Sequence, residues 1–197
     1  HIRSVYFSRI NYAELGSLGY VLSGVVEPNE IIKDKKISPF NIGEKIYLDD
    51  FSSEEVGQFV NQAGLKLDQL SFERMTFWTG GNPRILWDVC SQLETAARNM
   101  AITAEMIDAS VADYYLKNFD HAPVDHIREL VRENADVRSS VWSLVEGRPE
   151  EISDAAKTKL YLFGIIRAGG ASERPTIKNE IIAQALSAEW LKGLAKD

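Results

Sequence analysis

Residues 77–93 read FWTGGNPRILWDVCSQL, and the turn at 80–84 (Gly-Gly-Asn-Pro-Arg) decides how this part of the chain folds. Stretches with the apolar spacing of a helix lie on both sides of the turn. Pro83 would be the first residue of the second helix, where proline is tolerated because the first amides of a helix have no intrahelical acceptor. The turn therefore predicts a corner between helices and places Arg84 in the first helical turn, from which its guanidinium group can reach outward.

The residues around this turn, 51–117, predict a bundle of short helices. Ser52 and Glu55 are spaced as a capping box, which satisfies backbone amides at a helix start, and Gly64 suits the end of that helix. Further helices are predicted near 69–78, from 83 to about 98, and after Thr103. Tight turns between short amphipathic helices are typical of a small helical domain.

Residues 1–50 have a different pattern, which predicts a small α/β region. A short helix is expected at about 4–15, a helical turn at 29–35, and strands at 20–26 and 45–48. Such strands do not form a stable sheet by themselves, so they would belong to a larger one. Exposed strand edges can also pair with another copy of the chain, and a homo-oligomer is therefore one expectation. The whole chain is predicted to be mainly α.

Residues 118–197 have the order of elements of a winged helix. The predicted elements are helices at 125–133, at 135–145 and after Ser153, strands at 164–167 and 175–178, and a last helix at 180–194. The glycine-rich segment 169–172 would form the tip between the strands. Helices followed by a hairpin with a flexible tip predict a winged-helix domain.

Composition limits the class of protein. The chain has 197 residues, a net charge of −7 and 45% hydrophobic residues, which fits one large or two small folded domains. No apolar run approaches the ~20 residues of a membrane span, and no signal peptide is evident. The single cysteine, Cys90, falls on an apolar helical stripe, so we expect a buried thiol and a cytoplasmic location.

Residues 20–50 read YVLSGVVEPNEIIKDKKISPFNIGEKIYLDD, and several of their pieces recur in the same order in one family. The pieces are Leu22-Ser23-Gly24-Val25, Pro28 to Ile32, Asp34-Lys35 and Pro39-Phe40-Asn41-Ile42-Gly43, followed by Phe51-Ser52 and Trp78-Thr79-Gly80-Gly81. With them the chain resembles the AAA-like domain family of P-loop NTPases, of the STAND or AAA+ type, over about residues 3–98. The resemblance implies that residues 1–50 end a nucleotide-binding core and that 51–117 form a helical lid, which the winged helix predicted at 118–197 follows.

The resemblance also implies a nucleotide site at the corner. Arg84 would contact nucleotide phosphate, to which a planar group with several donors is suited. Asn82 and Pro83 would shape the corner, with the proline near the adenine, and Asn41 is a weaker candidate. The alternative is a glycine turn with a solvated arginine, and an Asn41 that bonds to its own turn. The implied cofactor is ATP or ADP with Mg²⁺ in the full-length protein, with none for this chain alone.

Two elements of nucleotide hydrolysis are absent from the sequence. It contains no GxxxxGK[ST] loop, whose amides would hold the phosphates, and no apolar strand that ends in an acidic pair for Mg²⁺. In the resembled family both elements precede the part that this chain matches. We therefore expect no hydrolysis by this chain alone, while ATPase activity of a full-length protein stays open.

Three functional hypotheses fit these patterns. In the first, the chain is part of a nucleotide-dependent regulatory or signalling switch, whose winged helix contacts the protein's own core or a protein effector. In the second, an origin-recognition or transposition-type ATPase, the winged helix binds duplex DNA. The DNA contacts would come from Lys157, Lys159, Arg167, Arg174 and Lys178. The net charge of −7 favours the first hypothesis. In the third, the chain is an adaptor that has lost its nucleotide chemistry.

The histidines and tryptophans are predicted to have structural roles. His121 and His126 lie beside aspartates but lack the spacing of a metal site, so we expect no metal there. The tryptophans lie at or near apolar helix positions and are predicted to pack in the core or between domains. They are Trp78, Trp87, Trp142 and Trp190.

Overall fold

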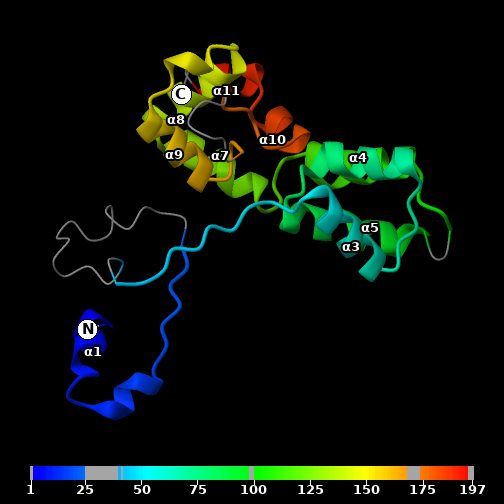
Figure 1. The fold of residues 1–197 in the computed structure, drawn as a ribbon. Helices are drawn as coiled ribbons and strands as arrows, with labels where there is room; N and C mark the ends of the chain where they lie inside the picture. The colour runs from blue at the N-terminus through cyan, green and yellow to red at the C-terminus, as the bar shows by residue number, and fades with distance from the viewer. Residues whose placement is uncertain (1, 25–39, 41, 98–99, 168–173, 195–197) are drawn as a thin grey trace. The chain divides into compact units, whose positions relative to one another are not determined.

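The structure, a computed structural model, describes residues 2–24, 40, 42–97, 100–167 and 174–194 (Figure 1). These residues are mostly helical, which confirms the prediction of a mainly α chain. The chain divides into two compact units, His1–Leu48 and Asp49–Asp197. Within the described ranges, no helix has the length and the apolar composition needed to cross a bilayer.

The first unit contains helix α1 (Ile2–Ser8) and the 3₁₀ helix η1 (Ala13–Ser17). The continuous helix predicted over 4–15 is thus interrupted by a turn at residues 9–11. Arg9 stabilises this turn, because its Nε donates to the carbonyl oxygen of Leu15 at 3.1 Å.

The predicted strands of the first unit are not formed where the structure describes them, at residues 20–24 and 45–48. A strand is stable only beside a hydrogen-bonding neighbour, and the described residues of this unit contain no other strand. Val21 is accordingly 97% exposed and Leu48 is 90% exposed. Residues 25–26 and the helical turn predicted at 29–35 lie outside the described residues.

The second unit begins with a helical bundle. It consists of α3 (Ser53–Gln62), α4 (Gln69–Thr79), α5 (Pro83–Ala97), α6 (Ala104–Val111) and the π-helical turn η3 (Ala112–Leu116). The predicted capping box is confirmed: the backbone N of Ser52 donates to the Glu55 carboxylate at 2.8 Å, and the Ser52 side chain accepts from the backbone N of Glu55. Asp68 and Thr103 each accept a backbone N–H at the starts of α4 and α6. Local sequence therefore sets where these helices begin.

The bundle closes around one apolar core, which includes Val56, Met75, Ile85, Leu86 and Ile107. Cys90 is buried as predicted, and burial raises the pKa of its thiol to about 12. Trp78 is buried as well, and its indole nitrogen donates to Asp108 at 2.6 Å. Trp87 departs from the predicted packing role, since it is 55% exposed. It lies beside the apolar stripe of α5 and not on it.

The C-terminal part of the second unit is a separate group of helices. They are α7 (Val124–Glu133), α8 (Ala135–Val145), η4 (Pro149–Glu151), α9 (Asp154–Leu162), α10 (Glu180–Ala185) and α11 (Ala188–Leu194). Between α9 and α10, Ile166 and Ile177 form an antiparallel bridge, and the backbone N of Lys178 donates to Ile165 at 2.9 Å. The segment 168–173 lies outside the described residues, and the winged helix stays a prediction. The single helix predicted at 180–194 is wrong, because residues 186–187 are not helical and separate α10 from α11.

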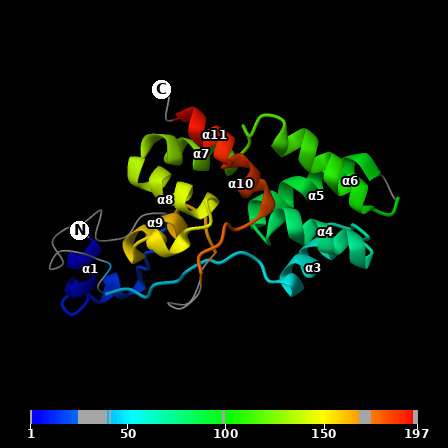
Figure 2. The same ribbon diagram turned by 90° about the horizontal axis from the view of Figure 1, so that it is seen from above.

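Helix α10 joins the bundle to the C-terminal helices (Figure 2). Ile181 and Ala185 belong to the core of the bundle. Ile182 and Leu186 belong to a second core, which the C-terminal helices form. Because both faces of one short helix are buried, the bundle and the C-terminal helices share a continuous packed interface.

Candidate functional site at the glycine corner

The turn between α4 and α5, residues 79–84, is called the glycine corner below. Gly80 ends α4 in the left-handed region, with φ of 58°, and its N–H donates to Thr76 at 2.8 Å. Glycine adopts this conformation without steric cost. Asn82 Oδ1 accepts the backbone N–H of Ile85 at 3.0 Å and so caps α5, whose first residue is Pro83. Asn82 and Pro83 therefore shape the corner.

One side of the glycine corner contacts the chain that enters the bundle. The backbone N of Phe51 donates to the carbonyl oxygen of Gly81 at 2.8 Å. A Cβ atom on Gly81 would lie 2.1 Å from the carbonyl oxygen of Phe51, at a φ of +80°. Only glycine allows this approach. Asn82 Nδ2 adds a longer hydrogen bond to Asp50, at 3.4 Å.

The other side of the glycine corner contacts the segment just before α10. Asn179 Nδ2 donates to the carbonyl oxygen of Thr79 at 3.1 Å, and this contact is buried. A Cβ atom on Gly80 would lie 2.6 Å from the carbonyl oxygen of Lys178. Arg167 Nε donates to that same oxygen at 2.9 Å. Two backbones far apart in the sequence therefore meet at Gly80 without an intervening side chain.

An ion pair between Asp50 and Lys178 links both sides of the corner. Lys178 Nζ lies 3.0 Å from Asp50 Oδ2, and the side chains are 11% and 17% exposed. Salt screens such a pair much less than a surface pair, and loss of one partner leaves a poorly solvated charge. Asp50, Asn82 and Lys178 thus form one polar contact that spans the entering chain, the corner and the C-terminal part.

Arg84 lies on the first turn of α5 and remains open to solvent. Its side chain is 57% exposed, and its Nε donates to Asp88 Oδ2 at 2.9 Å. The hydrogen bond to Asp88 and the charge of that carboxylate raise the pKa of Arg84. The ion pair uses Nε, so the terminal nitrogens of the guanidinium lie outside it. Such a group fits an anionic ligand such as nucleotide phosphate.

The other predicted site residues have different surroundings. Asn41 lies outside the described residues. Lys157 pairs with Asp154 at 3.1 Å and Arg174 pairs with Glu150 at 3.2 Å. Lys159 lies over the ring of Phe163, with Nζ 5.9 Å from the ring centre. Arg167 and Lys178 form the corner contacts described above. Three of the cations proposed for DNA, Lys157, Arg174 and Lys178, therefore already have carboxylate partners.

Sequence reasoning missed the partners of the corner, Asp50, Asp88 and Asn179. The spacing of Arg84 and Asp88 is that of an i,i+4 ion pair, which could have been recognised. Asn179 is a recognisable cap of α10, since its Oδ1 accepts the backbone N–H of Ile182 at 2.9 Å. No local signal indicates that its amide group also reaches Thr79, or that Lys178 pairs with Asp50.

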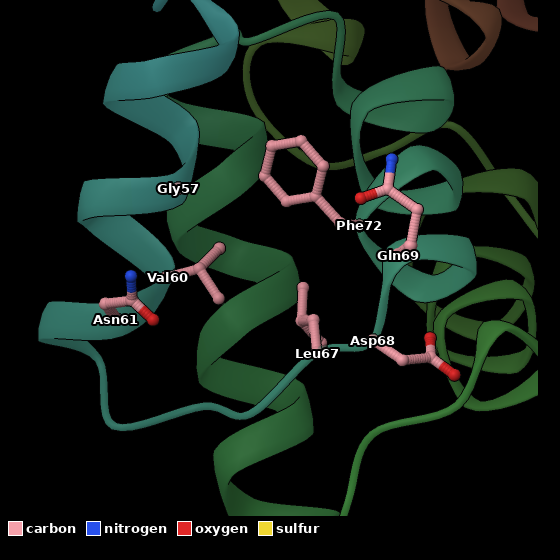
Figure 3. A pocket seen from close by; sticks show the side chains of 7 residues that line it. All are labelled: Gly57, Val60, Asn61, Leu67, Asp68, Gln69 and Phe72. Atoms are coloured by element: carbon pink, nitrogen blue, oxygen red, sulfur yellow. The ribbon is translucent and has the colours of Figure 1, made fainter.

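A shallow pocket of about 200 Å³ lies between α3 and α4, away from the glycine corner (Figure 3). Figure 3 shows the side chains of Val60, Leu67 and Phe72 around the space between the two helices. The carboxyl of Asp68, at its edge, accepts from Ser71 at the start of α4, and this bond lowers its pKa. None of the predicted site residues lines the pocket, so it does not serve as the candidate site.

The region of His121 and His126 contains no metal-binding cluster, and none is found elsewhere among the described residues. The ring of His121 stacks on that of Tyr114, with 3.9 Å between the ring centres. His126 lies 3.8 Å from Glu129 on the exposed face of α7.

The comparison with protein families decides the assignment. Residues 14–179 match the AAA-like domain family. The chain belongs to that family. The match to the AAA-like domain includes the whole glycine corner as well as Lys178 and Asn179.

One curated relative is an uncharacterised WD repeat-containing protein of Synechocystis sp., which is 30% identical over 210 residues. The alignment covers 97% of this chain and 17% of the relative, so the chain spans about one sixth of that protein. No solved structure matches the chain.

Proposed function

We propose that this AAA-like chain is the part of a nucleotide-dependent regulatory switch that reads a bound nucleotide and passes its state to the C-terminal helices. Arg84 would contact the phosphate of ATP or ADP bound by the full-length protein. The observation that carries the proposal is the double attachment of the glycine corner to residues 50–51 and to residues 178–179.

The attachment supports a mechanical link because its contacts are short, buried and partly between backbones. Gly80 and Lys178 approach so closely that a Cβ atom would not fit, and Asn179 donates to Thr79. A rotation of α5 that follows contact between Arg84 and phosphate cannot leave residues 178–179 in place. Helix α10 begins at Glu180, and its two buried faces would carry the displacement into both cores. Packed cores respond to such displacements in discrete steps.

The proposed output is a contact with the protein's own domains or with a protein effector. The name of the Synechocystis relative assigns WD repeats to a polypeptide with a similar segment, and such repeats build propellers. A propeller in the same polypeptide is one partner of this kind. We do not extend the proposal to duplex DNA, because Lys157, Arg174 and Lys178 already pair with carboxylates.

The test is nucleotide binding by the full-length protein, measured by calorimetry with ATP and ADP in the presence of Mg²⁺. We expect micromolar binding that weakens at least about tenfold in Arg84→Ala, since a charge-assisted contact is lost. Lys159→Ala, whose side chain lies on α9, is the control and should bind as the wild type does. Hydrogen exchange at residues 178–186 should slow or accelerate with nucleotide in the wild type only. Absence of nucleotide binding by the full-length protein would leave the adaptor hypothesis in its place.

A further inference from the structure

Behind Arg84 lies a buried polar pair, Asp88 and Tyr115. Asp88 follows Arg84 by one turn of α5 and is only 3% exposed. Its Oδ2 atom accepts from Arg84 Nε at 2.9 Å and from the hydroxyl of Tyr115 at 2.7 Å. Tyr115 is fully buried within η3, in the core of the bundle. The two donors approach one carboxylate oxygen from the surface and from the core.

The buried carboxylate constrains the arginine more than an exposed one would. A carboxylate inside a protein needs charged or hydrogen-bonding partners, because burial deprives it of water. Burial and the neighbouring Asp88 raise the pKa of Tyr115, which keeps its hydroxyl protonated as a donor. Since Tyr115 sits in a packed core, Asp88 cannot swing away, and Arg84 is held at Nε. An exposed i,i+4 pair has no such anchor.

We infer that Asp88 and Tyr115 are positioning residues for the nucleotide contact of Arg84. Tyr115 fixes Asp88, and Asp88 holds the guanidinium group at Nε beside the ring of Trp87, so that the terminal nitrogens stay outside the ion pair before nucleotide arrives. Holding the side chain in advance removes the entropy cost of ordering it upon binding. This inference rests on the proposed function, because it concerns the same nucleotide and the same arginine.

The bundle contains a second set of residues with the same chemical groups but a more exposed carboxylate, 39% for Asp108, which provides a control for the loss of one carboxylate charge. Arg74 Nε donates to Asp108 Oδ1, and the indole nitrogen of Trp78 donates to the same oxygen at 2.6 Å. This set therefore also combines an arginine, an aspartate and an aromatic donor. Arg74 lies on α4 and Asp108 on α6, and neither contributes to the glycine corner. Loss of its carboxylate charge perturbs the bundle without touching Arg84.

The experiment measures ADP binding to the full-length protein by calorimetry. The variants are Asp88→Asn, Tyr115→Phe and the control Asp108→Asn, each made alone and with Arg84→Ala. Asp88→Asn keeps the side-chain shape, and the Tyr115 hydroxyl retains a second acceptor, the carbonyl oxygen of Ala122 at 3.2 Å. Melting temperatures identify variants that fail to fold. If Asp88→Asn fails to fold, Asp88→Glu provides a second test that retains the charge.

We expect Asp88→Asn to weaken ADP binding about fivefold and Tyr115→Phe about threefold, the scale of one immobilised side chain. Both effects should vanish in the Arg84→Ala background, while Asp108→Asn should leave affinity unchanged in either background. A loss that persists without Arg84, or an equal loss in Asp108→Asn, would show a merely structural role and overturn the inference. Wild-type protein that does not bind ADP would overturn both the inference and the proposed function. Binding that depends on Arg84 but not on Asp88 would overturn the inference alone.

Discussion

Replacement of Gly80 by alanine has two energetic costs at the glycine corner, backbone strain and the loss of backbone contact, and replacement of Gly64 separates them. Gly80 has a φ of +58°, and a Cβ atom there would lie 2.6 Å from the carbonyl oxygen of Lys178 and 2.9 Å from Asn179 Cβ. Gly64, at the end of α3, has a φ of +73° with nothing within 4 Å of its Cβ position. Gly64→Ala therefore measures strain alone, and Gly80→Ala measures strain together with displacement of residues 178–179.

The magnitudes follow from these distances. A left-handed alanine costs roughly 1–2 kcal/mol relative to glycine. Atoms forced into a packed region cost about 1–3 kcal/mol more. We therefore expect Gly64→Ala to lower the free energy of unfolding by about 1 kcal/mol and Gly80→Ala to lower it by about 3 kcal/mol.

The assay is urea unfolding of the 197-residue chain, followed by far-ultraviolet circular dichroism. The free energies of unfolding of wild type, Gly64→Ala and Gly80→Ala are compared. The comparison is valid if the slope of free energy against urea concentration is the same for all three proteins. If the two variants differ by less than about 0.5 kcal/mol, the corner is not packed against Lys178, and the mechanical link proposed for the switch loses its basis.

Three further predictions concern single contacts. Lys178→Met should lower the free energy of unfolding by about 2 kcal/mol, because Asp50 keeps a poorly solvated charge without its partner. Asp50→Asn in the same chain should recover part of the loss. Urea unfolding should give the same loss at low and at high salt because the pair is largely buried, and a loss that disappears at high salt would contradict this. The hydrogen bond from Arg74 holds the pKa of Asp108 below its ordinary value of 3.8, so its contribution to stability is complete above that pH and is lost as the pH falls through the lowered pKa. Acid unfolding of Asp108→Asn should therefore depend less on pH in this range, and an unchanged profile would contradict the pairing. Burial raises the pKa of the Cys90 thiol to about 12. Iodoacetamide at pH 8 should therefore label Cys90 slowly in the native chain and rapidly in urea, as measured by mass spectrometry. Rapid labelling of the native chain would show that the core opens at Cys90.

Patterns that act over one helical turn were predictable from the sequence. Ser52 and Glu55 lie three residues apart, so the capping box needs no other part of the protein. The same holds for the glycine corner, because glycine conformation and proline tolerance are local properties. Burial of Cys90 followed from helical periodicity, since the apolar stripe of a helix faces the core.

Features that depend on a distant part of the chain could not be predicted in the same way. The strands expected at 20–26 and 45–48 have suitable side chains, but pairing depends on a neighbouring strand, and their described residues have none. Trp87 lies only one position from the buried Leu86, and its exposure is decided by where the neighbouring helices pack. Periodicity identifies an apolar face but not the limits of the surface that covers it.

The amino-acid sequence by itself determined the helical class, the starts of the bundle helices α3 to α6 and the turn that presents Arg84. Only the tertiary structure decided that Lys178 pairs with Asp50, that Asn179 reaches Thr79 and that Asp88 is buried beneath Arg84. The reason is physical. Capping and turn formation are governed by backbone geometry within a few residues. The contacts of Lys178 and Asn179 join residues far apart in the chain, and Asp88 is buried because Tyr115, on η3, packs against it in the bundle.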